Sequence, residues 1–212
     1  MTEATTKRGK FIVFEGTDGC GKSTQMRMLE KYLTGMGVEC YMTHEPTDSL
    51  FGAQLRACMS GRLDADERAI AALFAADRLD HITNSVNGIM GKLDAGVTVL
   101  CDRYYLSSFA YNSGAAPLEW VIGLNRLAME MLPPDLTIYI DVPVEVTARR
   151  LGRRNERERY ETQEKQLTVH KTYLQLFERF RETEHIEIVK SEANKEDTQK
   201  HIREIVNGLF GF

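Results

Sequence analysis

The sequence has no long apolar run and no paired-cysteine motif. Only four of its 212 residues are cysteines, and no two of them have the C-x-x-C spacing of zinc and redox sites. The first ten residues lack the apolar segment of a secretory signal, and the longest nearly apolar stretch, residues 69–76, is too short to span a bilayer. These absences predict a soluble, cytoplasmic protein with reduced thiols and no membrane partner.

Basic residues are also fewer than acidic residues. The chain has 27 Lys and Arg against 31 Asp and Glu, which gives a formal net charge of −4. A general nucleic-acid binder needs a broad positive surface, so this balance argues against nucleic acid as a partner. Six arginines nevertheless gather within residues 149–159. Any positive charge that matters for function is therefore expected to be local.

Short strand-like runs alternate with longer segments that have helical periodicity. The expected strands are residues 11–15, 38–43, 97–102, 136–141 and 185–190. Alternating β and α elements predict an α/β fold with three layers, in which a five-stranded parallel sheet is flanked by helices. The length suits one such domain over residues 1–212 and is short for two.

The first expected strand runs directly into a sequence of the form G-x-x-x-x-G-K-[ST], typical of a P-loop. Glycines let such a loop turn its N–H groups toward phosphate oxygens at a helix N-terminus. Lys22 is expected to bridge the β- and γ-phosphates of ATP, and the Ser23 hydroxyl to ligate Mg²⁺. The ATP-binding candidates are Gly16, Thr17, Asp18, Gly19, Cys20, Gly21, Lys22, Ser23 and Thr24.

A P-loop alone is compatible with kinases, ATPases and GTPases. Residues 194–197 read Asn-Lys-Glu-Asp and resemble a guanine-binding motif, which would favour a GTPase switch. However, no D-x-x-G follows the third strand, and the one that the chain contains, Asp18 to Gly21, lies inside the P-loop. We therefore expect Asn194 to cap the final helix. The P-loop is also compatible with a kinase that uses another acceptor and with a catalytically silent binding module.

The third expected strand ends on Asp102 and Arg103. A carboxylate at this position, beside a P-loop, can orient Mg²⁺, so Ser23 and Asp102 are the metal candidates. Arg103 can bridge donor and acceptor phosphates as their charges approach each other. The pair predicts phosphoryl transfer, whereas an Asp-Arg dipeptide alone could also be a surface ion pair.

Five motifs occur in the order found in thymidylate kinases, and the sequence resembles that family. They are FEGTDGCGKSTQ at 14–25, HEPT at 44–47, LFAADR at 73–78, DRYYLSSFAYN at 102–112 and RERYE at 157–161. The resemblance implies transfer of the γ-phosphoryl group of ATP to dTMP with Mg²⁺, giving dTDP and ADP for dTTP biosynthesis. It also implies a homodimer.

The same resemblance implies roles for individual residues. Phe74 would stack on thymine, Arg78 would bond the base carbonyl, and Tyr111 would disfavour a 2′-hydroxyl. By spacing alone, Phe74 and Tyr111 would also fit core positions, and Arg78 would also fit a solvated position. The complete set of implied dTMP-binding residues is Asp18, Glu45, Pro46, Arg56, Phe74, Arg78, Arg103, Ser107, Ser108, Tyr111 and Tyr160.

Thymidylate kinases carry a catalytic arginine either in the P-loop or in a mobile lid. The variable P-loop positions here contain no arginine, whereas residues 150–161 are rich in arginine and resemble the lid. Arg153 and Arg157 are the main candidates, and Arg154 is a further one. Residues 157–161 also resemble the lid of the other class, so the class stays open. The expected catalytic set is Lys22, Arg103, Arg153, Arg157 and Asp18.

A helix expected around residues 66–92 is where the resemblance implies dimer contacts. Its apolar positions are Ile70, Leu73, Ile82, Val86 and Ile89. A buried core would produce the same pattern, so the sequence leaves both interpretations open.

Overall fold

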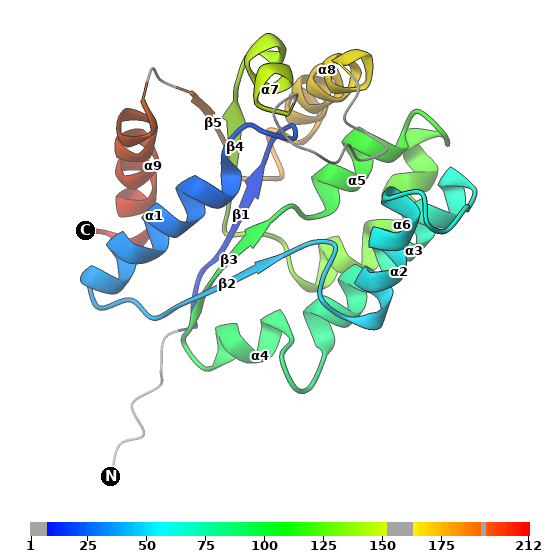
Figure 1. The fold of residues 1–212 in the computed structure, drawn as a ribbon. Helices are drawn as coiled ribbons and strands as arrows, with labels where there is room; N and C mark the ends of the chain where they lie inside the picture. The colour runs from blue at the N-terminus through cyan, green and yellow to red at the C-terminus, as the bar shows by residue number, and fades with distance from the viewer. Residues whose placement is uncertain (1–7, 152–162, 192–193) are drawn as a thin grey trace.

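A five-stranded, all-parallel sheet forms the centre of the molecule (Figure 1). The computed structural model describes residues 8–151, 163–191 and 194–212. The strands, in the spatial order β2-β3-β1-β4-β5, are β1 (Phe11–Glu15), β2 (Cys40–His44), β3 (Thr98–Asp102), β4 (Leu136–Asp141) and β5 (Ile186–Lys190). This arrangement confirms the predicted parallel sheet.

Helices cover both faces of the sheet, which confirms the three-layer α/β fold class (Figure 1). Helices α1 and α9 pack on one face, and α5, α6 and α8 lie on the other. The helices are α1 (Lys22–Gly35), α2 (Leu50–Met59), α3 (Glu67–Thr83), α4 (Ile89–Asp94), α5 (Tyr105–Asn112), α6 (Leu118–Met131), α7 (Val144–Leu151), α8 (Gln163–Phe180) and α9 (Lys195–Phe210). Most of the expected lid, residues 152–161, lies outside the described residues.

The central strand β1 shows why the sheet is buried on both sides. Successive side chains of a strand point to opposite faces. Ile12 and Phe14 accordingly pack with α1 and α9, whereas Phe11 and Val13 pack in the core on the other face, with α5 and α8. All five residues of β1 are buried. The nearly continuous apolar sequence of this strand follows from that double burial.

The predicted strand boundaries hold to within two residues. The ranges of β1 and β4 are as predicted, β3 and β5 begin one residue later, and β2 covers 40–44 instead of 38–43. The late start of β2 has a local cause. The N–H of Val38 donates to the carbonyl of Leu33 at the end of α1, so it serves the helix terminus and not the sheet.

The helix expected around 66–92 is wrong as a single element, because the chain breaks between α3 and α4. The side chain of Asn84 accepts a hydrogen bond from the N–H of Val86, and its carbonyl accepts one from Gly88. Such a local bond competes with helix continuation. A Cβ atom at position 88 would lie 2.4 Å from the carbonyl oxygen of Asn84, so only glycine permits this turn.

Three of the five apolar positions proposed for a dimer interface are core residues of this chain. Ile70, Ile82 and Ile89 are almost completely buried within it. Leu73 packs partly against the small cluster between α2 and α3, and only Val86, at 88%, is largely exposed. The alternative interpretation of this pattern, a buried core, is therefore correct for most of it.

Asn194 caps α9, as predicted. Its side-chain oxygen accepts a hydrogen bond of 2.8 Å from the N–H of Asp197, which satisfies one of the donors at the start of the helix. The motif that resembles a guanine-binding sequence thus has a structural explanation.

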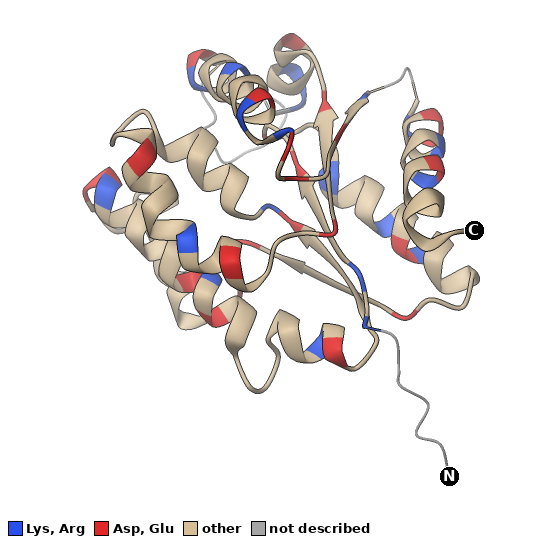
Figure 2. Cartoon of the chain, turned by 180° about the vertical axis from the view of Figure 1, so that it is seen from behind, with Lys and Arg blue, Asp and Glu red and all other residues tan. Residues whose placement is uncertain are grey.

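Figure 2 shows that acidic and basic residues are interspersed over the described helices. All four cysteines are free thiols, and three of them are buried. Among the described helices, none combines the length and the apolar character that crossing a membrane requires.

Candidate active site

The chain brings its motifs together at the carboxyl ends of three neighbouring strands. β1 leads into the P-loop, β3 ends at Asp102 and Arg103, and β2 ends just before Glu45. In open parallel sheets, ligands bind at this edge. Strand order therefore assembles segments that are as many as 85 residues apart in the sequence, as for Asp18 and Arg103.

Three glycines give the P-loop its shape. Gly16, Gly19 and Gly21 have φ angles of 144°, 79° and 107°, which side chains larger than hydrogen rarely adopt. The loop leads directly into α1, whose first residue is Lys22. The ammonium of Lys22 is nearly buried and donates to the carbonyl oxygens of Gly16, at 3.1 Å, and Thr17, at 3.4 Å.

A cavity of about 640 Å³ opens in front of the P-loop. Seven of the nine ATP-binding candidates line it: Asp18, Gly19, Cys20, Gly21, Lys22, Ser23 and Thr24. The other two, Gly16 and Thr17, contribute the carbonyl groups that hold Lys22. This space is the candidate donor cavity.

Ser23 and Asp102, the metal candidates, are in direct contact. The hydroxyl of Ser23 donates to Oδ2 of Asp102 at 3.0 Å. The other oxygen, Oδ1, is buried without a hydrogen-bond partner in the described part of the chain and lies 3.7 Å from Nζ of Lys22. A hydroxyl beside an unsatisfied carboxylate oxygen fits Mg²⁺, whose remaining ligands can come from phosphate and water. No cluster of three or more His, Cys, Asp or Glu suitable for a metal occurs among the residues described.

Asp18 links the P-loop to Arg103. Its Oδ1 accepts from Nη2 of Arg103 at 2.5 Å, and its Oδ2 accepts from the hydroxyl of Tyr111 at 3.0 Å and from Gln166 at 3.1 Å. Burial alone would raise the pKa of Asp18. The positive charges of Arg103 and Lys22, together with these hydrogen bonds, instead lower it to about 2.

Arg103 is held from both its backbone and its side chain. Its φ angle of 73° is in the left-handed region, which is unusual for a residue with a side chain. Its N–H donates to the carbonyl of Phe14, and Nη1 donates to the hydroxyl of Ser107 at 3.0 Å. The guanidinium also lies 4.8 Å from the ring centre of Tyr111. Backbone strain that persists at such a position is typical of functional sites.

Glu15, at the end of β1, supports this region and was not predicted. Its carboxylate is completely buried and accepts hydrogen bonds from the N–H of Tyr104, from both the N–H and the hydroxyl of Ser107, and from the hydroxyl of Tyr173. Burial raises the pKa of Glu15 above its usual value. Glu15 therefore fixes the start of α5, which carries the side chains that face Arg103.

A second cavity, of about 260 Å³, lies beside the first. Ten of the eleven residues that the sequence implies for dTMP line it, namely Asp18, Glu45, Pro46, Arg56, Phe74, Arg78, Arg103, Ser107, Ser108 and Tyr111. The eleventh, Tyr160, lies outside the described residues. Phe74 lines the cavity and also packs against the small core between α2 and α3, so its stacking on thymine stays a prediction.

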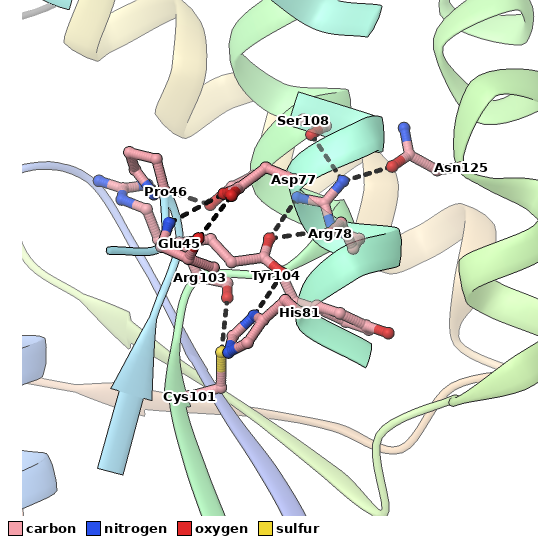
Figure 3. A network of polar contacts seen from close by, with 12 residues as sticks. Glu45, Pro46, Asp77, Arg78, His81, Cys101, Arg103, Tyr104, Ser108 and Asn125 are labelled. Carbon is pink, nitrogen blue, oxygen red and sulfur yellow. Dashed lines mark hydrogen bonds and ion pairs between the residues drawn. The ribbon is translucent and has the colours of Figure 1, made fainter. Parts of the chain in front are cut away.

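Arg78 is the most enclosed cation of this second cavity (Figure 3). Its Nε and Nη2 donate to one carboxylate oxygen of Glu45, at 2.9 and 2.6 Å, and its Nη1 donates to Ser108 and Asn125. The other oxygen of Glu45 lies 3.1 Å from Nδ1 of His81. Glu45 thus occupies the cavity wall with both oxygens engaged by α3.

The turn after β2 is clamped by a second buried carboxylate, Asp77. It accepts hydrogen bonds from the N–H and the hydroxyl of Thr47 and from the hydroxyl of Ser49. The guanidinium of Arg56 donates to the carbonyl oxygens of Thr47 and Pro46. Asp77 was also not predicted, because a carboxylate in a helix gives no sequence sign of a partner 30 residues away.

The two cavities share four lining residues: Asp18, His44, Glu45 and Arg103. Donor and acceptor spaces that meet at a cation suit the transfer of a charged group from one to the other. The lid candidates Arg153, Arg154 and Arg157 lie outside the described residues, so their positions stay predictions. Arg150, at the end of α7, does reach the P-loop and donates to the carbonyls of Gly19 and Cys20 at 3.1 and 3.3 Å.

The low pKa of Asp18 predicts how stability depends on pH. Its folded-state pKa lies below its ordinary value of 3.8, so the stabilisation that it contributes is present above that value and is lost as the pH falls toward 2. We expect the difference in the free energy of unfolding between the wild type and Asp18→Asn to shrink as the pH falls from about 5 to about 2. Urea unfolding of both proteins across this range measures it. A difference that stays constant with pH would contradict the assignment.

The chain is similar to known proteins over most of its length. The family model described as "Thymidylate kinase" matches residues 14–202. A "Probable thymidylate kinase" of Thermococcus gammatolerans is 37% identical, over 95% of this chain and 100% of the relative. One of Thermococcus onnurineus is 38% identical, over 92% and 96%. A "Thymidylate kinase" of Desulfotalea psychrophila is 37% identical, over 76% and 80%. The chain belongs to the thymidylate kinase family.

Proposed function

We propose that this protein transfers the γ-phosphoryl group of ATP to the phosphate of dTMP and so forms dTDP and ADP. The observation that carries the proposal is that a P-loop cavity and a smaller cavity meet at Asp18 and Arg103. The curated relatives named as thymidylate kinases support the same acceptor. The P-loop alone would leave the acceptor undefined.

On the donor side, Lys22 would contact the β- and γ-phosphates once it exchanges its carbonyl partners for phosphate oxygens. Ser23 and Asp102 would hold Mg²⁺, directly or through water. When bound, Mg²⁺ would neutralise part of the charge on the β- and γ-phosphates. The N–H groups of the loop would bind the remaining phosphate oxygens.

On the acceptor side, Arg103 would bind the dTMP phosphate while Arg78 and Phe74 bind the base. A phosphate oxygen of dTMP attacks the γ-phosphorus. The bond from that phosphorus to the oxygen bridging the β- and γ-phosphates breaks, and ADP leaves. No strong base is needed, because the attacking oxygen is already anionic. Catalysis then comes from alignment and from stabilisation of charge by Lys22 and Arg103.

A lid over the two cavities would complete the site. The arginines of residues 150–161, with Arg153 and Arg157 first, are proposed to stabilise the transferring phosphoryl group. Tyr160 is proposed to contact dTMP. Closure of such a segment would exclude water, so that the phosphoryl group reaches dTMP instead of solvent.

We further propose that the chain is a single-domain, cytoplasmic enzyme that acts as a homodimer. Exposed apolar side chains on α6, including Trp120 at 41% and Leu127 at 52%, offer a surface that dimerisation could cover. They replace the core residues of α3 and α4 as interface candidates. Light scattering on the purified protein tests the proposal, and a monomer mass at working concentration would refute it.

The activity is tested by measuring ADP release from ATP and Mg²⁺ with dTMP, dUMP, AMP, CMP, GMP or thymidine as acceptor. We expect strong turnover with dTMP, weak turnover with dUMP and none with purine monophosphates. If thymidine or a purine monophosphate is the best acceptor, the dTMP assignment is wrong. If no acceptor stimulates turnover and GTP binds better than ATP, the kinase assignment is wrong.

A further inference from the structure

Almost all of the hydrogen-bonding capacity of Arg78 is used within the protein (Figure 3). A guanidinium has five N–H groups and no acceptor. Nε and one N–H of Nη2 donate to Glu45, and the two N–H groups of Nη1 donate to Ser108 and Asn125. Within the described residues this leaves one N–H on Nη2 for a ligand. The group can therefore satisfy one acceptor atom in the cavity and can accept nothing.

His81 fixes the carboxylate that holds Arg78. Its Nδ1 lies 3.1 Å from Oε1 of Glu45, and its Nε2 lies 2.7 Å from the hydroxyl of Thr43. A carboxylate only accepts, so Nδ1 carries the hydrogen, and in the neutral ring Nε2 accepts from Thr43. The ring is nearly buried and has a partner at each nitrogen. A rotation of Glu45 away from Arg78 would break this arrangement.

Asn125 fixes Arg78 from the opposite side. Its Nδ2 donates to the carbonyl of Val121, one turn earlier in α6, at 2.8 Å. That bond decides which end of the amide faces inward, so Oδ1 must face Nη1 of Arg78. The ring of Tyr104 lies against the guanidinium, 5.4 Å from its centre. Arg78 is thus held at both edges and on one face.

We propose that His81 and Asn125 are positioning residues that set base selectivity through Arg78. They fix its guanidinium in the wall of the acceptor cavity, where the remaining N–H can bond a pyrimidine with a carbonyl group but not one with an amino group at the same place. A site that pairs a buried donor with a ligand acceptor discriminates strongly against analogues that leave the donor unpaired. The inference rests on the proposed function and assigns selectivity to residues behind the binding surface.

The test compares kcat/KM for dTMP and dUMP, which carry a 4-carbonyl, with that for dCMP, which carries a 4-amino group. For His81→Leu and Asn125→Leu we expect KM for dTMP to rise and the preference for dTMP over dCMP to fall, each by about tenfold, the factor that one hydrogen bond commonly contributes. KM for ATP should stay near the wild-type value, because the donor cavity does not contain these side chains.

Two further variants separate positioning from general loss of structure. His81→Asn retains an amide N–H near the position of Nδ1 and should restore most of the preference. His185→Leu makes the same substitution as His81→Leu at a half-exposed histidine just before β5, at the opposite end of the sheet, and should behave as the wild type. Matching melting temperatures verify that the compared proteins are folded.

The outcomes are distinguishable. A wild type that does not phosphorylate dTMP removes the proposed function, before any variant is considered. A wild type that does, combined with a folded His81→Leu and a folded Asn125→Leu that keep the full preference over dCMP, removes this inference alone. If His81→Leu does not fold, a folded Asn125→Leu that keeps the full preference over dCMP overturns the inference by itself.

Discussion

Replacing Arg103 by Ala is expected to lower kcat for dTMP phosphorylation by at least about a hundredfold, with the fold intact. The guanidinium lies where the two cavities meet and is held by Asp18, Ser107 and Tyr111. An orientation that is fixed before the substrates bind needs little reorganisation as charge develops, which is why its loss costs turnover. Steady-state kinetics with saturating ATP and dTMP measure the effect.

Two variants accompany this measurement. Arg103→Lys keeps the charge but cannot donate to two partners in one plane, so we expect it to recover only part of the lost rate. Arg68→Ala removes an exposed arginine that pairs with Asp66 at the start of α3, away from both cavities, and should leave kcat unchanged. Near-normal turnover by Arg103→Ala would show that the residue has no part in phosphoryl transfer.

Replacing Lys22 by Ala is expected to have an effect of similar size, again at least about a hundredfold on kcat. The ammonium is nearly buried beside the P-loop carbonyls and 3.7 Å from Asp102. Its removal takes a fixed cation from the donor cavity, where charge develops on the transferred group. The loss should appear with every nucleotide acceptor, because Lys22 lines the donor cavity and not the acceptor cavity.

A matched control for this variant is Lys10→Ala. Lys10 pairs with Asp135 just before β1, at the end of the sheet opposite the P-loop, and its loss should not change kcat. An effect of Lys22→Ala on dTMP selectivity, with little effect on kcat, would be inconsistent with a donor-side role and would require another assignment for the residue.

Motifs that depend on local sequence were readily predicted. The P-loop, the Asp102-Arg103 pair and the range of β1 follow from residues that are adjacent in the chain. The turn at Asn84 was missed, because the apolar spacing continues across it while a single side-chain hydrogen bond ends the helix. Periodicity detects which face is apolar and is insensitive to such a local interruption.

Buried polar partners were the main gap in the predicted site. The hydrogen bond between Tyr173 and Glu15 joins residues 158 positions apart, and no local pattern signals it. In α8 a signal did exist. Gln166 lies on the buried stripe with Val169 and Tyr173, and a polar residue on an apolar stripe indicates a partner in the core. The neighbouring apolar residue, Leu167, is by contrast half exposed.

The left-handed backbone of Arg103 has a consequence for protein engineering. Holding a residue with a side chain in that conformation costs roughly 1–2 kcal/mol, whereas glycine adopts it without penalty. A design procedure that ranks substitutions only by backbone conformation would therefore favour Arg103→Gly. Its product would lose the cation where the cavities meet and leave the carboxylate of Asp18 without its ion-pair partner. Position 103 should be held constant in any attempt to make this protein more heat-resistant.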